Sequence, residues 1–216
     1  MYHRVGDGYP AIYELTPEQF TAQMDWLVEN GYRTLSLDEL KGYLEKRFCP
    51  PGDRYVVLTF DDGFRSTYTQ VYPTLRDRGL TGIAFLIGYQ IRFTKEQIQE
   101  MESDGTLEFG SHLLTHSTGS TLRLEGISEE TLKNEISTTN YILKDLTGKD
   151  NTSLAWPGGA YSGWGITLAA QYGIDMMFTT NIGPSSPGDS TYQIKRVGIF
   201  SYDTLDDFIQ KVINGK

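Results

Sequence analysis

Residues 55–63 read YVVLTFDDG, an almost continuously apolar run that ends in two adjacent aspartates and a glycine. Such a run, rich in β-branched residues, is typical of a strand that is buried on both faces of a parallel sheet. The turn signal CPPGD stands directly before it, at residues 49–53. We therefore predict a strand over 55–60, with Asp61 and Asp62 at its carboxyl end.

Helix start signals recur along the rest of the chain. Thr16 is followed three residues later by Gln19, which is the pattern of a capping box. Ser36 and Glu39 repeat this pattern. Pro73 lies inside a further helical pattern and predicts a kink there. The expected helices cover residues 16–31, 36–46, 66–79, 94–105, 128–148, 163–173 and 203–214.

Eight candidate strands alternate with these helices. They cover residues 1–5, 32–37, 55–60, 81–88, 107–111, 153–156, 175–180 and 192–199. Repeated βα units favour a parallel sheet, and right-handed crossovers with short loops close such a sheet most simply into a barrel. The predicted fold class is therefore α/β, a barrel of seven or eight βα units, with a doubly wound open sheet as the alternative.

The composition limits the classes of protein to consider. A length of 216 residues without a repeat or linker predicts a single domain over 1–216. The formal net charge of −9 argues against nucleic acid as a partner, because that binding rests largely on Lys and Arg. A single cysteine, Cys49, excludes an intrachain disulfide. No apolar run predicts a membrane span, and MYHRVGDGYPAIYEL lacks the basic and apolar regions of a signal peptide.

The adjacent aspartates form the first candidate site. In a barrel of parallel strands the catalytic groups lie at the carboxyl ends of the strands, where Asp61 and Asp62 are expected. Neighbouring side chains diverge there, so the two carboxylates can take different roles. The alternative is a strand-ending turn, with an aspartate as helix cap and Gly63 at the tight bend.

Two histidines form the second candidate site. In FGSHLLTH, residues 109–116, His112 and His116 are four residues apart, which on a helical turn puts both imidazoles on one side. With one carboxylate they make three protein ligands and leave a position for water, which is the pattern of a catalytic metal site. The alternative is a solvated helix face. Both candidate sites fall at strand ends that a barrel brings to one rim, which favours a common site.

These motifs resemble those of a known family. TFDDG at 59–63, SHLLTH about fifty residues later and LAWPGGAY at 154–161 are similar to the motifs of the polysaccharide deacetylases of carbohydrate esterase family 4, the NodB-homology domain. The likeness also includes PEQF, NGYRTLSLDEL, YPTL and MFTT, and so covers nearly the whole chain. It implies a distorted (β/α) barrel that uses a divalent metal to remove acetyl groups from N-acetylated or O-acetylated glycans.

The resemblance also assigns roles to residues. Asp61 corresponds to the catalytic base of the family and Asp62 to its metal-binding aspartate, while His112 and His116 correspond to the two metal histidines. Zinc is the first choice of metal, although two histidines, a carboxylate and water also accept cobalt, nickel, iron or manganese. Such a triad holds non-haem iron in oxidative enzymes too, but an adjacent second aspartate fits a hydrolytic base better.

The sequence departs from the family at its arginine motif. Ala155 stands where the family has the arginine that orients the base and lowers its pKa. Arg196 is the candidate to replace that arginine, with an ordinary ion pair as the alternative. Asp175 stands where the family often pairs a carboxylate with the arginine, and so lacks its expected partner. Gly158 aligns with the residue whose backbone N–H helps to hold the oxyanion, a role that needs no particular side chain.

A second departure concerns the acid that protonates the leaving group, for which the family usually has a histidine near the C-terminus. No histidine follows His116 in this sequence. In a closed barrel the first strand lies beside the last, so His3 is a candidate for this acid, and imidazole exchanges protons near neutrality. Tyr2 and His3 also resemble the start of the permuted exopolysaccharide N-deacetylases of biofilm formation.

The expected substrate is an acetylated glycan that contains N-acetylglucosamine. The alternatives are an O-acetylated xylan or other sugar ester, and a carbohydrate-binding pseudoenzyme that the missing arginine suggests. The resemblance implies an extracellular or cell-envelope location, with the cytoplasm as the alternative for a chain without a signal peptide, and the oligomeric state is left open. Four residues near the PGG turn are candidate sugar contacts: Trp156, Pro157, Tyr161 and Trp164. For Trp156, packing in the core is an equal alternative.

Overall fold

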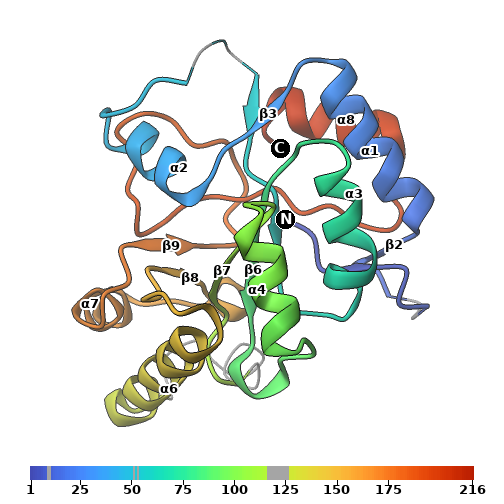
Figure 1. The fold of residues 1–216 in the computed structure, drawn as a ribbon. Coiled ribbons are helices and arrows are strands. Elements are labelled where there is room, and N and C mark those ends of the chain that lie inside the picture. The colour runs from blue at the N-terminus through green and yellow to red at the C-terminus, as the bar shows by residue number, and fades with distance from the viewer. Residues whose placement is uncertain (9–10, 51, 53, 116–126) are drawn as a thin grey trace.

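A parallel sheet forms the centre of the molecule in the computed structural model, which describes residues 1–8, 11–50, 52, 54–115 and 127–216 (Figure 1). Its strand order is β5-β6-β7-β8-β9, and every neighbouring pair is parallel. The predicted α/β class is therefore confirmed. The five strands are β5 (Thr59–Phe60), β6 (Gly82–Leu86), β7 (Leu107–Ser111), β8 (Ser153–Ala155) and β9 (Met176–Phe178).

Two smaller parallel sheets accompany the central one. They pair β1 (Arg4–Val5) with β2 (Glu14–Leu15), and β3 (Arg33–Thr34) with β4 (Tyr55–Val56). The single strand predicted over 55–60 is therefore wrong in one respect, because its first half pairs with β3 and its second half with β6. An apolar run shows that a segment is buried, but it does not show that the chain changes partner within the segment.

The helices follow the predicted start signals. The capping boxes predicted at Thr16 and Ser36 are both present. The kink expected at Pro73 is replaced by a π-helical turn, Thr67–Val71, that ends directly before α3, where the Tyr72 N–H donates to the Thr67 carbonyl. The α-helices are α1 (Pro17–Glu29), α2 (Leu37–Leu44), α3 (Tyr72–Arg76), α4 (Lys95–Ser103), α6 (Glu129–Thr147), α7 (Gly163–Gln171) and α8 (Leu205–Asn214).

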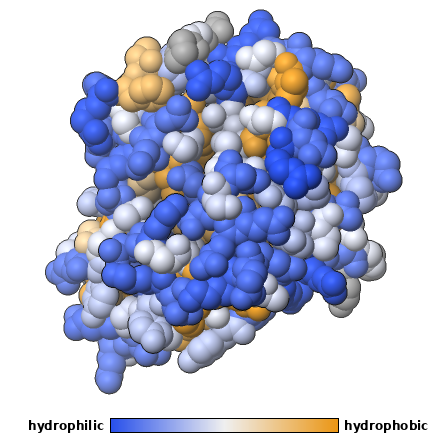
Figure 2. All heavy atoms as spheres, viewed as in Figure 1, coloured by the Kyte–Doolittle hydropathy of each residue, from blue (hydrophilic) through white to orange (hydrophobic). Residues whose placement is uncertain are grey.

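The helices pack around the sheet. Because its strands are parallel, their carboxyl ends lie along one edge, which is called the rim below. Helices α4 and α6 contact β7 and each other, α1 contacts α3 and α8, and Figure 1 shows α4 lying across one face of the sheet. Figure 2 shows that the outer surface in this view is mainly hydrophilic, as expected for helices whose apolar faces are turned inward. None of the described helices combines the length and the apolar composition that a bilayer crossing requires.

The strands do not close into the predicted barrel within the described part of the chain. Residues 192–199, predicted as a strand, are irregular and join the sheet only through an isolated bridge between Ile194 and Phe178. The prediction is wrong because this segment leaves the ladder: the Arg196 N–H, for example, donates to the Asn181 carbonyl. A cavity of about 280 Å³, lined in part by Val56 and Ile194, lies beside this irregular segment.

The N-terminal segment lies between β5 and the last segment of the chain. It runs beside β5, where the Tyr2 N–H donates to the Thr59 carbonyl at 2.8 Å and the Asp61 N–H donates to the Tyr2 carbonyl at 2.9 Å. On its other side, the Ile199 N–H donates to the Met1 carbonyl at 3.0 Å. The first segment therefore lies between the last segment and β5, which is the neighbour relation that the barrel prediction requires for residue 3.

Candidate active site

The carboxyl end of β5 carries a buried ion pair. Arg196 Nη1 lies 2.7 Å from Asp61 Oδ1, and Arg196 Nη2 lies 2.9 Å from Asp61 Oδ2, so the guanidinium binds both carboxylate oxygens. Both residues are almost fully buried. Arg196 Nε also donates to the Thr179 carbonyl at 2.9 Å, just beyond β9. The plane of the guanidinium, and with it the plane of the carboxylate, is thereby held in one orientation.

This ion pair sets the charge of Asp61. Burial by itself raises the pKa of Asp61, because it penalises the charged form. Arg196, and to a lesser extent His112 and His3, favour the charged form and bring the pKa well below its ordinary value. Asp61 is therefore an ionised, oriented carboxylate.

Asp62 and His112 form a second pair on the same rim. His112 follows β7 directly, and its Nε2 lies 3.4 Å from Asp62 Oδ1. The backbone is left-handed at Asp62, with φ of 74°, and at Leu113, with φ of 59°. Such values are uncommon for residues other than glycine and cluster at functional sites. The turns after both strands are thus held in an unfavourable conformation that aims the two side chains at each other.

The tautomer of His112 is determined by its other ring nitrogen. His112 Nδ1 lies 2.7 Å from the Ala155 carbonyl, which can only accept, so Nδ1 carries a proton. Burial lowers the pKa of His112, but the hydrogen bond to Asp62 and the charges of Asp61 and Asp62 outweigh this and raise it. The arrangement therefore favours a positive charge between Nε2 and Oδ1, either a second proton or a cation.

A divalent cation fits between these two atoms. Two ligand atoms of a tetrahedral zinc, each about 2.0–2.1 Å from the ion, lie about 3.4 Å apart, as Nε2 and Oδ1 do. The hydrogen bond from Nδ1 to a carbonyl is also the usual support of a metal-binding histidine. The third expected ligand, His116, lies outside the described residues. Among the described residues, no cluster of three or more His, Cys, Asp and Glu side chains is placed to hold a metal.

The structure brings His3 to this rim. Asp61, Asp62 and His112 are all close enough to shift its pKa, so the first segment contributes to the same group of charges as β5 and β7. Burial, with smaller contributions from His112 and Arg196, lowers the pKa of His3, although the two carboxylates raise it. Its Nδ1 is buried without a hydrogen-bond partner among the described residues. The ring of Tyr13 packs on the imidazole, with centroids 4.5 Å apart.

The turn after β8 borders the site with two glycines in left-handed conformations. Gly158, with φ of 60°, is exposed, while the next two N–H groups turn back to the Trp156 and Pro157 carbonyls. A Cβ on Gly159 would lie 1.9 Å from Thr180 Oγ1, so this close approach requires a glycine. The PGG sequence therefore lets the backbone of residue 158 face outward.

Two of the four predicted sugar contacts are corrected by their burial. Trp156 is 1% exposed and packs in the core with Leu154 and Leu168, and Pro157 is buried as well. Neither ring offers a face to a sugar, so the core-packing alternative holds for Trp156. The reason is that residue 156 directly follows β8 and its N–H still donates to the Phe178 carbonyl at 3.0 Å, before the chain turns outward.

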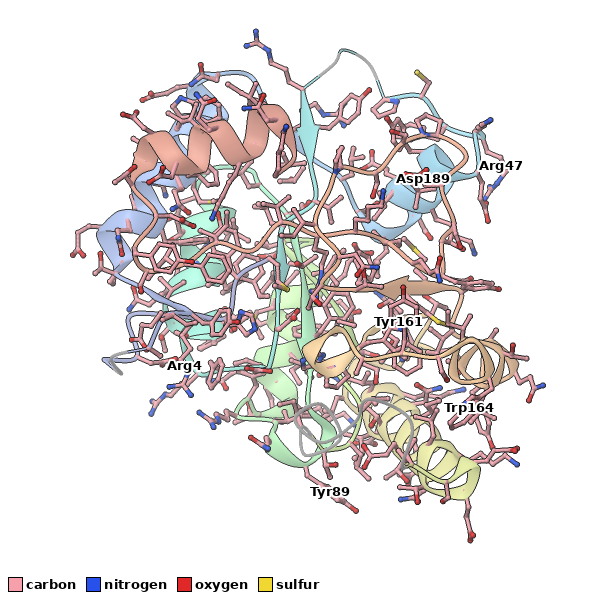
Figure 3. The ribbon with its side chains drawn as sticks, turned by 180° about the vertical axis from the view of Figure 1, so that it is seen from behind. Arg4, Arg47, Tyr89, Tyr161, Trp164 and Asp189 are labelled. Carbon is pink, nitrogen blue, oxygen red and sulfur yellow. The ribbon has the colours of Figure 1, made fainter. Side chains whose placement is uncertain are left out.

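The other two predicted contacts lie at the surface. Tyr161 is half-buried and its hydroxyl accepts a hydrogen bond from Asn181 Nδ2 at 3.1 Å, while Trp164 is 40% exposed at the start of α7. Figure 3 shows both on the opposite side of the molecule from Arg4. Asp175, expected to lack the family arginine as its partner, instead forms an ion pair with Lys41.

The sequence prediction missed Glu135. This buried side chain of α6 accepts hydrogen bonds from the Leu114 N–H at 2.9 Å, the Thr115 N–H at 2.9 Å and the Thr115 hydroxyl at 2.8 Å. It anchors the backbone that follows His112. A signal was present, because a glutamate occupies the apolar face of an amphipathic helix, next to Ile136.

Comparisons with known proteins point to one family. A family model described as polysaccharide deacetylase matches residues 49–177. YxkH of Bacillus subtilis, which bears the family's name, is 29% identical over 203 residues, covering 92% of this chain and 70% of YxkH. A poly-β-1,6-N-acetyl-D-glucosamine N-deacetylase of Staphylococcus epidermidis is 27% identical over 213 residues, covering 92% of this chain and 72% of that protein. The solved structure of IcaB from Ammonifex degensii has a TM-score of 0.84 at 25% identity, covering 98% of this chain and 93% of IcaB.

The Asp62–His112 pair leads to a prediction about metal binding. Asp62→Asn and His112→Ala should each weaken zinc binding by at least about 100-fold, because each removes a ligand atom. Asp61→Asn should change it by less than about threefold, since Asp61 is engaged by Arg196. Calorimetric titration of metal-free protein with zinc chloride measures this, with Asp175→Asn as the control. Loss of zinc in Asp61→Asn, with retention in Asp62→Asn, would show that the two aspartates have exchanged roles.

Proposed function

Because the chain belongs to the polysaccharide deacetylase family, we propose that this hydrolase removes acetyl groups from N-acetylglucosamine units of a polysaccharide or oligosaccharide. The observation that carries the proposal is the joint presence, on one rim, of an oriented carboxylate, a carboxylate–imidazole pair suited to a cation, and a second imidazole. The names of relatives support the amide over the ester, since a relative that this chain matches over most of its length is a poly-β-1,6-N-acetyl-D-glucosamine N-deacetylase.

Asp61 is the proposed general base. Its pKa lies well below its ordinary value, so it is ionised at neutral pH and can take a proton from the attacking water. Arg196 is the proposed positioning residue, because both carboxylate oxygens are bound to its guanidinium. Arg196 thus takes the place of the arginine that Ala155 replaces in the family motif, which argues against an impaired pseudoenzyme.

Asp62, His112 and His116 are the proposed ligands of a divalent cation, zinc first. When bound, such a cation supplies a lower pKa for water and polarises the acetyl carbonyl. The residues themselves do the rest: the Ala155 carbonyl fixes the His112 ring, and Glu135 holds the backbone that leads toward residue 116.

The Gly158 N–H is the proposed donor to the oxyanion that forms as water adds to the acetyl carbon. One well-placed donor of this kind contributes about 3 kcal/mol to catalysis. His3 then donates a proton to the amide nitrogen, the C–N bond breaks, and acetate and the free amine leave. A lowered pKa means that His3 is mostly neutral at neutral pH and must first take up a proton, and that the imidazolium so formed is a stronger acid toward a nitrogen that cannot depart as an anion.

Substrate choice provides the first test. Zinc-loaded protein should release acetate from β-1,6-linked N-acetylglucosamine oligomers more than about tenfold faster than from acetylated xylan oligomers, and Asp61→Asn should lower turnover by about 10²–10⁴-fold. Enzymatic measurement of acetate, with free amine counted in parallel, checks both. Faster release from acetylated xylan would transfer the proposal to the ester class, and no release from either would refute it.

The leaving group provides a test of His3. His3→Ala should lower turnover of an N-acetyl oligosaccharide by about 10²–10⁴-fold, because the amine needs a proton to depart. The same variant should retain most of its activity on an aryl acetate, whose phenolate leaves without protonation. Both rates are measured on one preparation of the variant. Their ratio therefore does not depend on how much of the protein is folded or metal-loaded. Equal losses on both substrates would contradict the acid role.

The ion pair predicts a split between kcat and KM. Arg196→Met should lower kcat by about 100-fold with little change in KM, since the guanidinium contacts the base rather than the substrate. Arg196→Lys should recover part of kcat, because it restores the charge but not the bidentate geometry. Circular dichroism identifies any variant that fails to fold, which is a concern because breaking a buried pair costs about 3–5 kcal/mol. A normal kcat in a folded Arg196→Met would contradict the positioning role.

A further inference from the structure

A series of aromatic rings leads away from His3 along the surface. The Tyr13 ring packs on the His3 imidazole at 4.5 Å between centroids, and the Phe200 ring packs on Tyr13 at 5.4 Å. Phe200 in turn stacks on Tyr202, with centroids 5.3 Å apart and planes only 12° from parallel. Tyr13, Phe200 and Tyr202 are called the aromatic platform below. They come from opposite ends of the sequence, so only the folded chain creates the series.

The aromatic platform is held in place by specific contacts. The Ser201 N–H donates to the Ile12 carbonyl at 2.8 Å, and Gln19 Nε2 donates to the Ser201 carbonyl at 3.1 Å. The Phe200 N–H donates to the buried Asp203 carboxylate at 2.8 Å. The ammonium of Lys211, which is paired with Asp203, lies 4.8 Å from the centroid of the Phe200 ring. The two loops are therefore joined to each other and to α1 and α8, as a preorganised surface requires.

The two tyrosines of the aromatic platform keep much of their ring surface in contact with water, while Phe200 is half-buried between them. Tyr202 is 67% exposed and Tyr13 39% exposed, and Ile12 beside them is 55% exposed. One face of Tyr202 lies on Phe200, so its exposed area includes the other face. Rigid aromatic side chains that stay exposed next to a reactive group indicate a binding surface, because they supply large contact area with little loss of conformational entropy.

We propose that Tyr13 and Tyr202, with Phe200 packed between them as support, bind the sugar units that neighbour the one being deacetylated, on the side of His3. The faces of a pyranose ring carry C–H groups and its edges carry hydroxyls, so a sugar can stack on an aromatic face while a tyrosine hydroxyl bonds its edge. The predicted ligand is thus a run of uncharged hexopyranose units. This inference rests on the proposed function and adds the position and class of its neighbouring subsite.

The placement gives the substrate a direction. Tyr13 touches His3 directly, so a sugar on the platform continues from the nitrogen that His3 is proposed to protonate. The aromatic platform therefore extends the site from the end at which His3 lies.

The length of the oligosaccharide substrate is the variable that tests this proposal. Tyr202→Ala should raise KM for a β-1,6-linked N-acetylglucosamine pentamer by about tenfold with little change in kcat, because stacking is lost while the reacting groups stay in place. KM for the dimer and for an aryl acetate should stay within about twofold. Tyr202→Phe should keep the pentamer KM within about threefold, since the ring face remains. Tyr141→Ala is the matched control, a 76% exposed tyrosine on α6.

A raised KM confined to the pentamer in Tyr202→Ala supports the aromatic platform. An equal KM for wild type and Tyr202→Ala on the pentamer, or an equal rise on the pentamer and the aryl acetate, overturns it. Wild type that releases acetate from neither oligomer refutes the proposed function instead, and this result is read from the wild-type rates alone.

Discussion

The buried ion pair between Asp61 and Arg196 is the interaction on which the active rim depends. Both charges are almost fully buried, and removing either partner would leave the other uncompensated in a poorly solvating interior. The pair therefore does more than set the charge of the base. Because Arg196 also binds the Thr179 carbonyl, it joins β5 to the end of β9 and to the irregular last segment. An ion pair thus connects β5 to the segment after β9, which strand pairing does not connect.

The same rim concentrates unfavourable local features that the fold compensates elsewhere. Left-handed backbone at Asp62 and Leu113, and a buried histidine facing a carboxylate, are costly by themselves. They are maintained by the parallel sheet beneath them, by the Ala155 carbonyl and by the Glu135 carboxylate. A positive charge between Asp62 and His112 relieves the electrostatic part of that cost, which is why the pair suits a cation.

The buried charged groups and the exposed aromatic rings occupy separate parts of the molecule. The charged residues lie where β5 and β7 end, in a partly dry setting that strengthens their interactions. Exposed rings lie further out, on loops that backbone hydrogen bonds attach to the helices. Under the proposed function, this separation lets the chemistry depend on a few buried contacts, while the length of glycan that is bound depends on the exposed rings.

The sequence by itself determined the βα alternation, the helix starts at Thr16 and Ser36, and the candidate residues Asp61 and His112, because periodicity, caps and motif spacing are local properties. Arg196 was a candidate from sequence, but only the tertiary structure decided that its guanidinium meets Asp61, 135 positions away in the chain. The tertiary structure likewise decided that residues 192–199 are no strand, that Trp156 is core, and that rings from both ends of the chain stack beside residue 3. The physical reason is that pairing partners, burial and stacking depend on which distant segments meet, and no local pattern encodes that meeting.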